Sequence, residues 1–272
     1  MTLYRTLPVP LIVFVFSGCT AFNARHTCTD QGTTSAEAAE VLELSTFNGG
    51  VTISPGDGTD VEYSVRYTAY GETDADAQAA CETLSCDVSQ EGGVLKITAL
   101  NPKRYLSAGA AFELKVPHSL AVRVDTTNGE VQASGLRAGL TVDTSNGTID
   151  CKTIAGDLDL KSSNGGISVF DASGTANLKT SNGNIRYSGM LTGMENKLSS
   201  SSGSIQLSIS PEIPTYVTAS TSNGRVDCKL PRVNTAAESK TALEALLGTA
   251  GDAQTTVQLS TSNGSVTIDA AL

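Results

Sequence analysis

Apolar and polar residues alternate on both sides of an Asn-Gly pair that recurs along the chain. The pair stands at residues 128, 146, 164 and 182, a constant spacing of 18, and again at 48, 223 and 263, with Ser202-Gly203 in the same series. A Val or Ile stands three residues after the first residue of each pair. Further apolar positions recur at fixed distances from the pair, and the positions between them are mostly Thr, Ser, Asp, Lys and Arg. Alternation with a period of two predicts short strands with one buried face on each side of a turn.

The fixed period predicts how these strands are arranged. Self-similarity near 20 residues is typical of solenoids, in which like residues stack on like residues in successive parallel coils. A second glycine in the regular coils, such as Gly156 or Gly174, marks a further corner. We therefore predict an all-β fold, a parallel, right-handed β-solenoid with about 18–21 residues per coil.

A different fold is compatible with the same local signal. Asn-Gly between alternating apolar residues is also the strongest short-range signal for a β-hairpin, because a type I′ turn needs positive φ at two positions. A row of such hairpins would form an antiparallel β-meander. The constant length of the repeats favours the solenoid, and the meander is the alternative.

The two ends of the repeat region are less regular. Residues 41–125 predict irregular strands and a short helix over 73–84, with Thr73 or Asp74 as N-cap, which together would cover the end of the solenoid. Residues 126–272 hold the repeats, interrupted near 235–248. There Thr235-Ala-Ala-Glu238 matches a capping box before an Ala/Leu-rich run, which predicts a helical insertion.

The N-terminus has the features of an export signal. Residues 1–18 contain one Arg and an apolar run, Leu7–Phe16, that is too short to span a membrane as a helix. Ser17-Gly18 before Cys19 resembles a bacterial lipobox, which implies cleavage before Cys19 and its acylation, although Phe16 replaces the usual Leu. The alternative is an ordinary signal peptide with a chance cysteine. Residues 19–40 would then form a polar tether.

Composition and charge narrow the classes of partner. The chain has 272 residues, 26 Gly, no Trp and a formal net charge of −10. An acidic surface repels phosphates, so we expect no nucleic acid partner. Only two His are present and the Cys spacing is not that of a zinc site, so we assign no metal and no cofactor.

Five cysteines follow Cys19. In an oxidising envelope a disulfide is expected, and we favour Cys81–Cys86, with Cys28 bonded to one of these two as the alternative. Cys151 and Cys228 share an inward column, so we predict two buried, unpaired structural thiols. Four rungs at ~4.8 Å would separate them by roughly 19 Å, well beyond the ~7 Å that a disulfide allows.

The outward positions carry charges that admit two interpretations. Asp143, Asp150, Lys161 and Arg186 could supply the acids and the base of a polysaccharide lyase. They fit better as a solvated face with weak ion pairs, worth ~0.2–1 kcal/mol each. The acids are not clustered, and no Trp is available for stacking on sugars. We therefore assign no catalytic residues.

Three features together resemble a known family. Val116-Pro117 before the repeats, the run TVDTSNG over 141–147 and the repeated T/S-S-N-G-x-I/V are similar to the bacterial "putative adhesin" family. The resemblance implies an envelope protein with a β-solenoid-like fold and no assigned catalytic residues. We expect a non-enzymatic lipoprotein, anchored by its lipid in the outer membrane and facing the periplasm or the surface. Its role would be adhesion or interaction with an envelope protein or polysaccharide, and the alternative is a carbohydrate-active enzyme on a β-helix.

Overall fold

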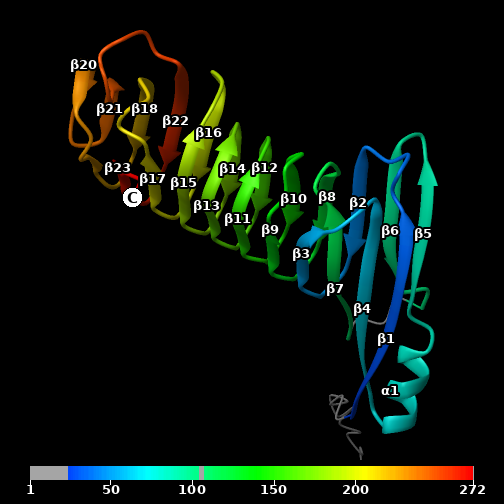
Figure 1. Ribbon diagram of the computed structural model, residues 1–272. Helices are drawn as coiled ribbons and strands as arrows, with labels where there is room; N and C mark the ends of the chain where they lie inside the picture. Colours follow the sequence, from blue (N-terminus) through cyan, green and yellow to red (C-terminus); the bar gives the residue numbers. More distant parts are fainter. Residues whose placement is uncertain (1–23, 104–106, 272) are drawn as a thin grey trace, which may run out of the picture.

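Two long β-sheets pack face to face along the whole molecule. The computed structural model describes residues 24–103 and 107–271. Within them one sheet, sheet A, has 11 strands and the other, sheet B, has 12. Figure 1 shows the strands of the two sheets as a stack of coils that widens at the N-terminal end, where the helix α1 lies.

The order of the strands in space differs from their order in the sequence at both ends of the stack. Sheet A runs β1 (Ala24–Ser35), β4 (Asp60–Gly71), β7 (Ala108–Pro117), β3 (Val51–Gly56), β9 (Val131–Ser134), β11 (Ile149–Ala155), β13 (Ile167–Gly174), β15 (Ile185–Leu191), β17 (Ile205–Ile209), β23 (Val266–Ala270) and β19 (Val226–Cys228). Sheet B runs β20 (Arg232–Glu238), β21 (Ala242–Leu247), β18 (Thr215–Thr221), β22 (Thr255–Thr261), β16 (Asn196–Ser200), β14 (Ala176–Thr180), β12 (Leu158–Ser162), β10 (Leu140–Thr144), β8 (Ala121–Thr126), β2 (Val41–Thr46), β6 (Val94–Leu100) and β5 (Ser85–Glu91).

The repeats form parallel coils, as their constant spacing predicts. In sheet B Val142 pairs with Leu160, and Leu160 pairs with Leu178, each 18 residues further along the chain. Sheet A has the same register, with Ile149 opposite Ile167. The antiparallel meander is therefore wrong for this region, because each strand pairs with its counterpart in the next coil and not with its sequence neighbour.

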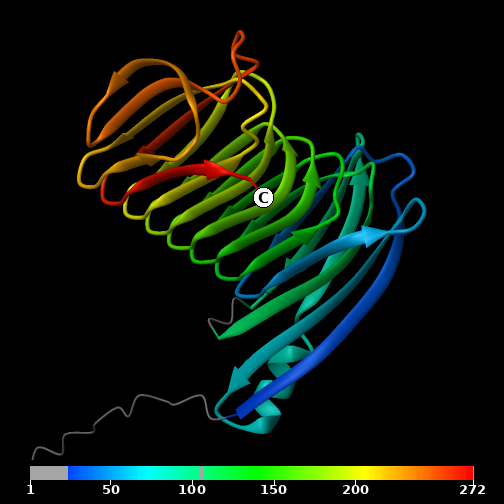
Figure 2. The same ribbon diagram turned by 60° about the vertical axis from the view of Figure 1, so that its left-hand side comes forward.

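The inward columns of the two sheets meet in one apolar core. Leu160, Ile167 and Val169 have no accessible surface, and the equivalent positions in the neighbouring coils are buried too. Burying such a side chain contributes roughly 1.5–3 kcal/mol. The coils lie directly on one another (Figure 2). Since every coil buries the same columns, the core continues along the stack.

The Asn-Gly corners stack on one another without forming hairpins. Asn164 donates from its side-chain amide to Asn146 Oδ1 over 2.7 Å, and Asn182 donates to Asn164 over 2.9 Å. Inside this ladder, the buried Ser162 hydroxyl donates to the carbonyl of Gly147. A Cβ on Gly165 would lie 1.8 Å from that same carbonyl oxygen. Glycine is thus required at this corner because adjacent coils approach closely there.

The last coil of the sequence is not the last coil of the stack. In sheet B β22 lies between β16 and β18, with Leu259 opposite both Leu198 and Ala219. In sheet A β23 lies between β17 and β19. The N-terminal end has the same arrangement, because β2 and β3 insert between the coil of β6 and β7 and that of β8 and β9.

Part of the predicted polar tether is a strand. Within residues 19–40, β1 pairs antiparallel with β4 over its whole length, placing Cys28 opposite Tyr67. Its outward positions are polar and exposed, and its inward positions range from the buried Ala24 to the exposed Asp30, so the strand lacks the apolar alternation of the repeats. It forms because it completes the free edge of β4. The predicted signal peptide, residues 1–18, and Cys19 lie outside the described residues.

Of the two predicted helices, one is confirmed and one is wrong. The helix α1 (Asp74–Cys81) begins after Thr73, whose hydroxyl and backbone N–H form a capping box with Asp76. Near 235–248 the chain instead forms β20 and β21, a hairpin added to β18. In β21 alternate residues, from Leu243 to Leu247, are buried. Pairing with β18 therefore overrides the helix propensity of this Ala/Leu run.

Candidate functional site

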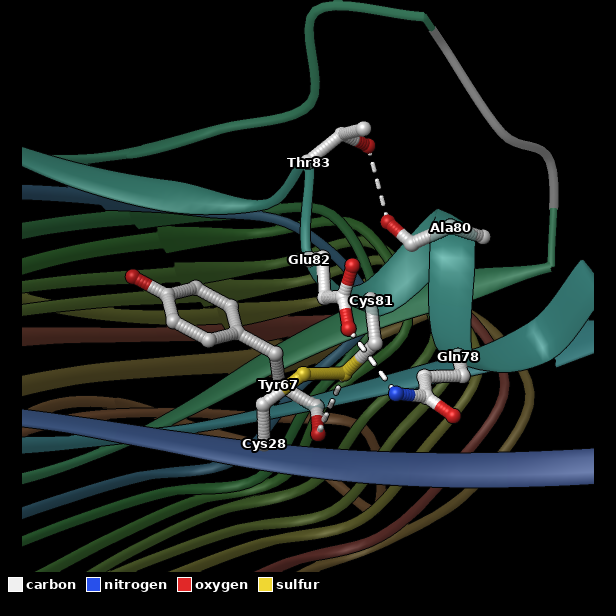
Figure 3. Close-up of a disulfide and its surroundings, with 7 residues drawn as sticks. All are labelled: Cys28, Tyr67, Gln78, Ala80, Cys81, Glu82 and Thr83. Carbon is white, nitrogen blue, oxygen red and sulfur yellow. Dashed lines mark hydrogen bonds between the residues drawn. A yellow bond between two sulfur atoms is a disulfide. The ribbon is translucent and has the colours of Figure 1, made fainter. Parts of the chain in front are cut away.

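The disulfide of the structure joins Cys28 to Cys81. Their Cα atoms are 6.2 Å apart (Figure 3), and the favoured Cys81–Cys86 pairing is wrong. The alternative, in which Cys28 bonds to one of the two, is the one observed. Cys81 ends α1, which packs on β1 and β4, whereas Cys86 lies in β5 of the opposite sheet. Proximity in the fold thus selects a partner 53 residues away over one that is five residues away.

The surroundings of the disulfide fix the end of the helix. Figure 3 shows Thr83 donating from Oγ1 to the carbonyl of Ala80 over 2.8 Å, and Gln78 donating from Nε2 to Glu82 over 2.9 Å. Cys81 is 1% exposed, and its Sγ lies 4.0 Å from the carbonyl oxygen of Tyr67. The disulfide therefore fastens the first strand to the helix and to β4.

The remaining thiols of the described residues are unpaired. Cys151 is buried in β11, while Cys86 and Cys228 are partly exposed. The strands β13, β15, β17 and β23 separate β11 from β19, where Cys228 lies. Cys151 and Cys228 are therefore five rungs apart, one more than the repeat order predicts, because β23 is inserted between β17 and β19. At ~4.8 Å per rung, their separation is roughly 24 Å. Cys228 is less buried than predicted since β19 is an edge strand of three residues.

We expect Cys151 to be the slowest of these thiols to react. Burial raises the pKa of Cys151 to about 12 and that of Cys86 to about 11, and burial is also the main cause that raises the pKa of Cys228. Since the thiolate is the nucleophile, alkylation of Cys151 at pH 8 should be at least about a hundredfold slower in the native protein than in denaturant. Mass spectrometry of each labelled cysteine over time measures this. Equal native rates at all three thiols would contradict it.

The charged residues considered for a lyase do not form one site. Asp150 and Arg186 lie on the outer face of sheet A, whereas Asp143 and Lys161 are register neighbours on the outer face of sheet B. The core separates these faces, which in stacked sheets are ≈ 10 Å apart before side chains are counted. Lys161 pairs with Asp159 at 2.8 Å. In residues 24–103 and 107–271 no group of His, Cys, Asp or Glu could hold a metal ion.

A polar hollow lies on the outer face of sheet A at the N-terminal end. It measures about 500 Å³ and is lined by β1, β3, β4 and β7, with Glu62 and Lys115 joined across it by an ion pair of 2.8 Å. The sequence did not indicate this hollow, because one of its walls is β1, which the composition suggested to be a tether. The alternation of apolar and polar residues in β4 could have indicated the hollow if residues 24–35 had been recognised as the strand that pairs with β4.

The family of the chain follows from its repeats. The family model described as Toastrack, DUF4097, matches residues 82–269, which include strands β5 to β8 and the repeat coils from Asn128 onward. This chain belongs to the Toastrack family. The resemblance to a family of adhesin-like proteins of unknown function is thereby confirmed. The Toastrack region excludes the start of the chain, including Cys19.

Solved structures that are similar to this Toastrack protein have low sequence identity and TM-scores below 0.5. A "putative adhesin" from Bacteroides fragilis is 13% identical, with 89% of this chain and 96% of that chain covered and a TM-score of 0.46. A "putative cell adhesion protein" from Clostridium sporogenes is 11% identical, with 90% and 99% covered and a TM-score of 0.39. A "putative lipid binding protein" from Parabacteroides distasonis is 14% identical, with 90% and 97% covered and a TM-score of 0.38. No curated protein matches this chain.

The only helix in the described residues is α1, of eight residues. Across the same residues, no helix has the length and apolar character needed to cross a membrane.

Proposed function

We propose that this Toastrack protein is a non-enzymatic envelope lipoprotein whose sheets serve adhesion or interaction with an envelope protein or polymer. The observation that carries the proposal is the short stretch of sequence between Cys19 and the first strand. Strand β1 begins at Ala24, five residues after the lipobox-like Cys19. Five residues span at most about 18 Å. An acyl chain on Cys19 would therefore hold the N-terminal end of the sheets beside the membrane, with the stack projecting from it.

The outer faces support a role in binding. Most outward positions of the repeats carry Ser, Thr, Asp, Lys, Arg, Asn or Gln, with the exposed Phe170 as an exception. They recur at the spacing of the coils, as in the row Asp143, Lys161 and Lys179 of sheet B. A rigid, regular array of polar groups can contact an extended partner at several points at once. The proposal includes no turnover of a substrate, because the charged residues considered for a lyase lie on opposite faces of the sandwich.

Replacing Cys19 by alanine tests both the lipid anchor and the proposed interaction with an envelope partner. In wild-type cells we expect the protein in the membrane fraction, with labelled palmitate incorporated. The Cys19→Ala protein should be released, because it lacks the residue that would carry the anchoring acyl chains. Crosslinking in intact cells, followed by affinity capture, should recover an envelope protein or polysaccharide with the wild type.

The matched control in both measurements is Cys86→Ala, which removes a thiol outside the lipobox. It should leave membrane association, palmitate labelling and the captured partner unchanged. Absence of palmitate from the wild type would refute the lipid anchor. Equal capture by the released Cys19→Ala protein would refute the need for anchoring, and capture of nothing by anchored protein would refute the interaction role.

A further inference from the structure

Three hollows follow one another along the outer face of sheet A at the N-terminal end. The first, of about 500 Å³, contains Glu62 and Ser64 of β4. The second, of about 160 Å³, shares Ser64 with the first and continues to Arg66. The third, of about 560 Å³, contains Thr68 and Tyr70 of the same strand. Because alternate residues of β4 line all three, they form one groove along the strand, which we call the β4 groove.

The length of the β4 groove follows from its end residues. Glu62 and Tyr70 are eight residues apart on a strand, which corresponds to roughly 27 Å. In Figure 1 the strand β4 stands beside β1, with which it pairs antiparallel, so the groove follows this pair of strands at the wide end of the stack. A groove of this length fits an extended chain better than a compact small molecule.

The groove is hollow at its centre because the residues of β7 that form its floor there are small. Antiparallel pairing of β4 with β7 places Arg66 opposite Ala111 and Thr68 opposite Gly109. A Cβ on Gly109 would lie 2.3 Å from the carbonyl oxygen of Asn48, so no larger residue fits there. On the other side of β4, strand β1 contributes Thr and Gln side chains and Arg25, all exposed. The hollow is therefore built by the sequence and register of these strands.

The groove carries the opposite charge to the rest of the protein. Its lining has three cations and two carboxylates, a balance of 3 − 2 = +1, in a chain whose formal charge is −10. Lys115 and Glu62 neutralise each other at 2.8 Å. Neither Arg25 nor Arg66 has an ion-pair partner in the part of the chain that the structure describes. An unpaired guanidinium can bind a carboxylate or phosphate in a bidentate geometry.

The other side chains of the groove suit sugar rings. Tyr70 is 40% exposed and lies opposite Arg25, which places an aromatic face beside a cation at one end. Aromatic side chains offer an apolar face with a polar tip. Hydroxyls recur along the remainder, and each can both donate and accept a hydrogen bond, as sugar hydroxyls do. The lining hydroxyl residues are Thr33, Thr52, Ser54, Ser64, Thr68 and Ser107.

We infer that the β4 groove binds an extended, acidic polysaccharide chain. The inference rests on the proposed function in that it names the polymer class the envelope scaffold would contact. A peptide strand fits less well, because peptides extend sheets at free edges. The backbone groups of β4 and β7 in the groove floor are already paired with neighbouring strands.

Binding by the purified full chain in detergent tests the inference. The probe is fluorescently labelled polygalacturonate, with neutral dextran and poly-glutamate as comparisons, and binding is followed by anisotropy at fixed salt. We expect polygalacturonate to bind and the other two to bind at least about tenfold more weakly. Arg66→Gln should weaken the binding about tenfold, as expected for losing a hydrogen bond to a charged group. Tyr70→Ser should also weaken it, because the stacking face is removed.

Arg186→Gln is the matched control, since it removes the same exposed charge from the same sheet outside the groove. It should leave the affinity within about twofold of the wild type. Equal losses in Arg66→Gln and Arg186→Gln would overturn the site, and equal binding of poly-glutamate would overturn the polysaccharide. No binding of polygalacturonate would overturn the inference. The measurement does not depend on acylation of Cys19 or on adhesion of cells, so its failure is distinguishable from failure of the proposed function.

Discussion

Replacing Gly165 by alanine should lower the free energy of unfolding by about 3 kcal/mol or more, near the upper end for overpacking. The added Cβ would lie 1.8 Å from the carbonyl oxygen of Gly147 in the preceding coil. That oxygen accepts the buried Ser162 hydroxyl, which in turn accepts the N–H of Gly165, both at 2.9 Å. The coils can separate only by stretching this link and the strand pairs beside it. Urea unfolding followed by circular dichroism measures the change.

The neighbouring glycine provides the control for this prediction. A Cβ on Gly166 would meet nothing closer than the carbonyl oxygen of Asn184 at 3.3 Å, and neither Gly165 nor Gly166 has a positive φ. Gly166→Ala should therefore change stability by less than about 1 kcal/mol. Two equal effects would mean that loss of glycine flexibility, and not the close approach of coils, sets the cost.

Replacing Asn196 by alanine should also cost about 3 kcal/mol, through buried groups left without partners. Asn196 is 3% exposed and lies at the start of β16, beside the inserted last coil. Its Oδ1 accepts the backbone N–H of Ala176 at 2.9 Å. Its Nδ2 donates to the carbonyls of Thr192 and Thr256, at 3.0 and 2.9 Å. One side chain thus joins three segments of the chain. Its truncation leaves a backbone N–H and two backbone carbonyls buried without hydrogen-bond partners.

Two variants separate this explanation from a general effect of losing an amide. Asn196→Asp keeps the acceptor for Ala176 but turns the donor into a second oxygen facing two carbonyls, so it should be at least as damaging as alanine. Asn182→Ala removes an exposed rung of the ladder, whose bond to Asn164 is 2.9 Å, and should cost only about 0.5–1 kcal/mol. Chemical denaturation of the three variants measures the order. An effect of Asn182→Ala as large as that of Asn196→Ala would contradict the argument.

The sequence alone determined the features that repeat or are local. The spacing of 18 predicted parallel coils in register, and the columns predicted which residues, such as Leu160 and Ile167, would be buried. The helix after Thr73 was also predicted, because its capping box involves residues three apart. Such signals can be read from the chain since the partners are either adjacent or placed by a constant period.

Only the tertiary structure decided the features that depend on pairing between distant segments. Cys81 bonds to Cys28 because α1 packs on β1, and the polar β1 is ordered because β4 offers it a free edge. The Ala/Leu run near 242–247 became a strand because β18 needed a partner, against its own helix propensity. The insertion of β22 and β23 ahead of β18 and β19, and the groove over β4, follow from the same non-local pairing. A repeated pattern fixes which face of a strand is buried. It does not fix which strand comes next in the stack, because every coil offers equivalent backbone edges to its neighbours.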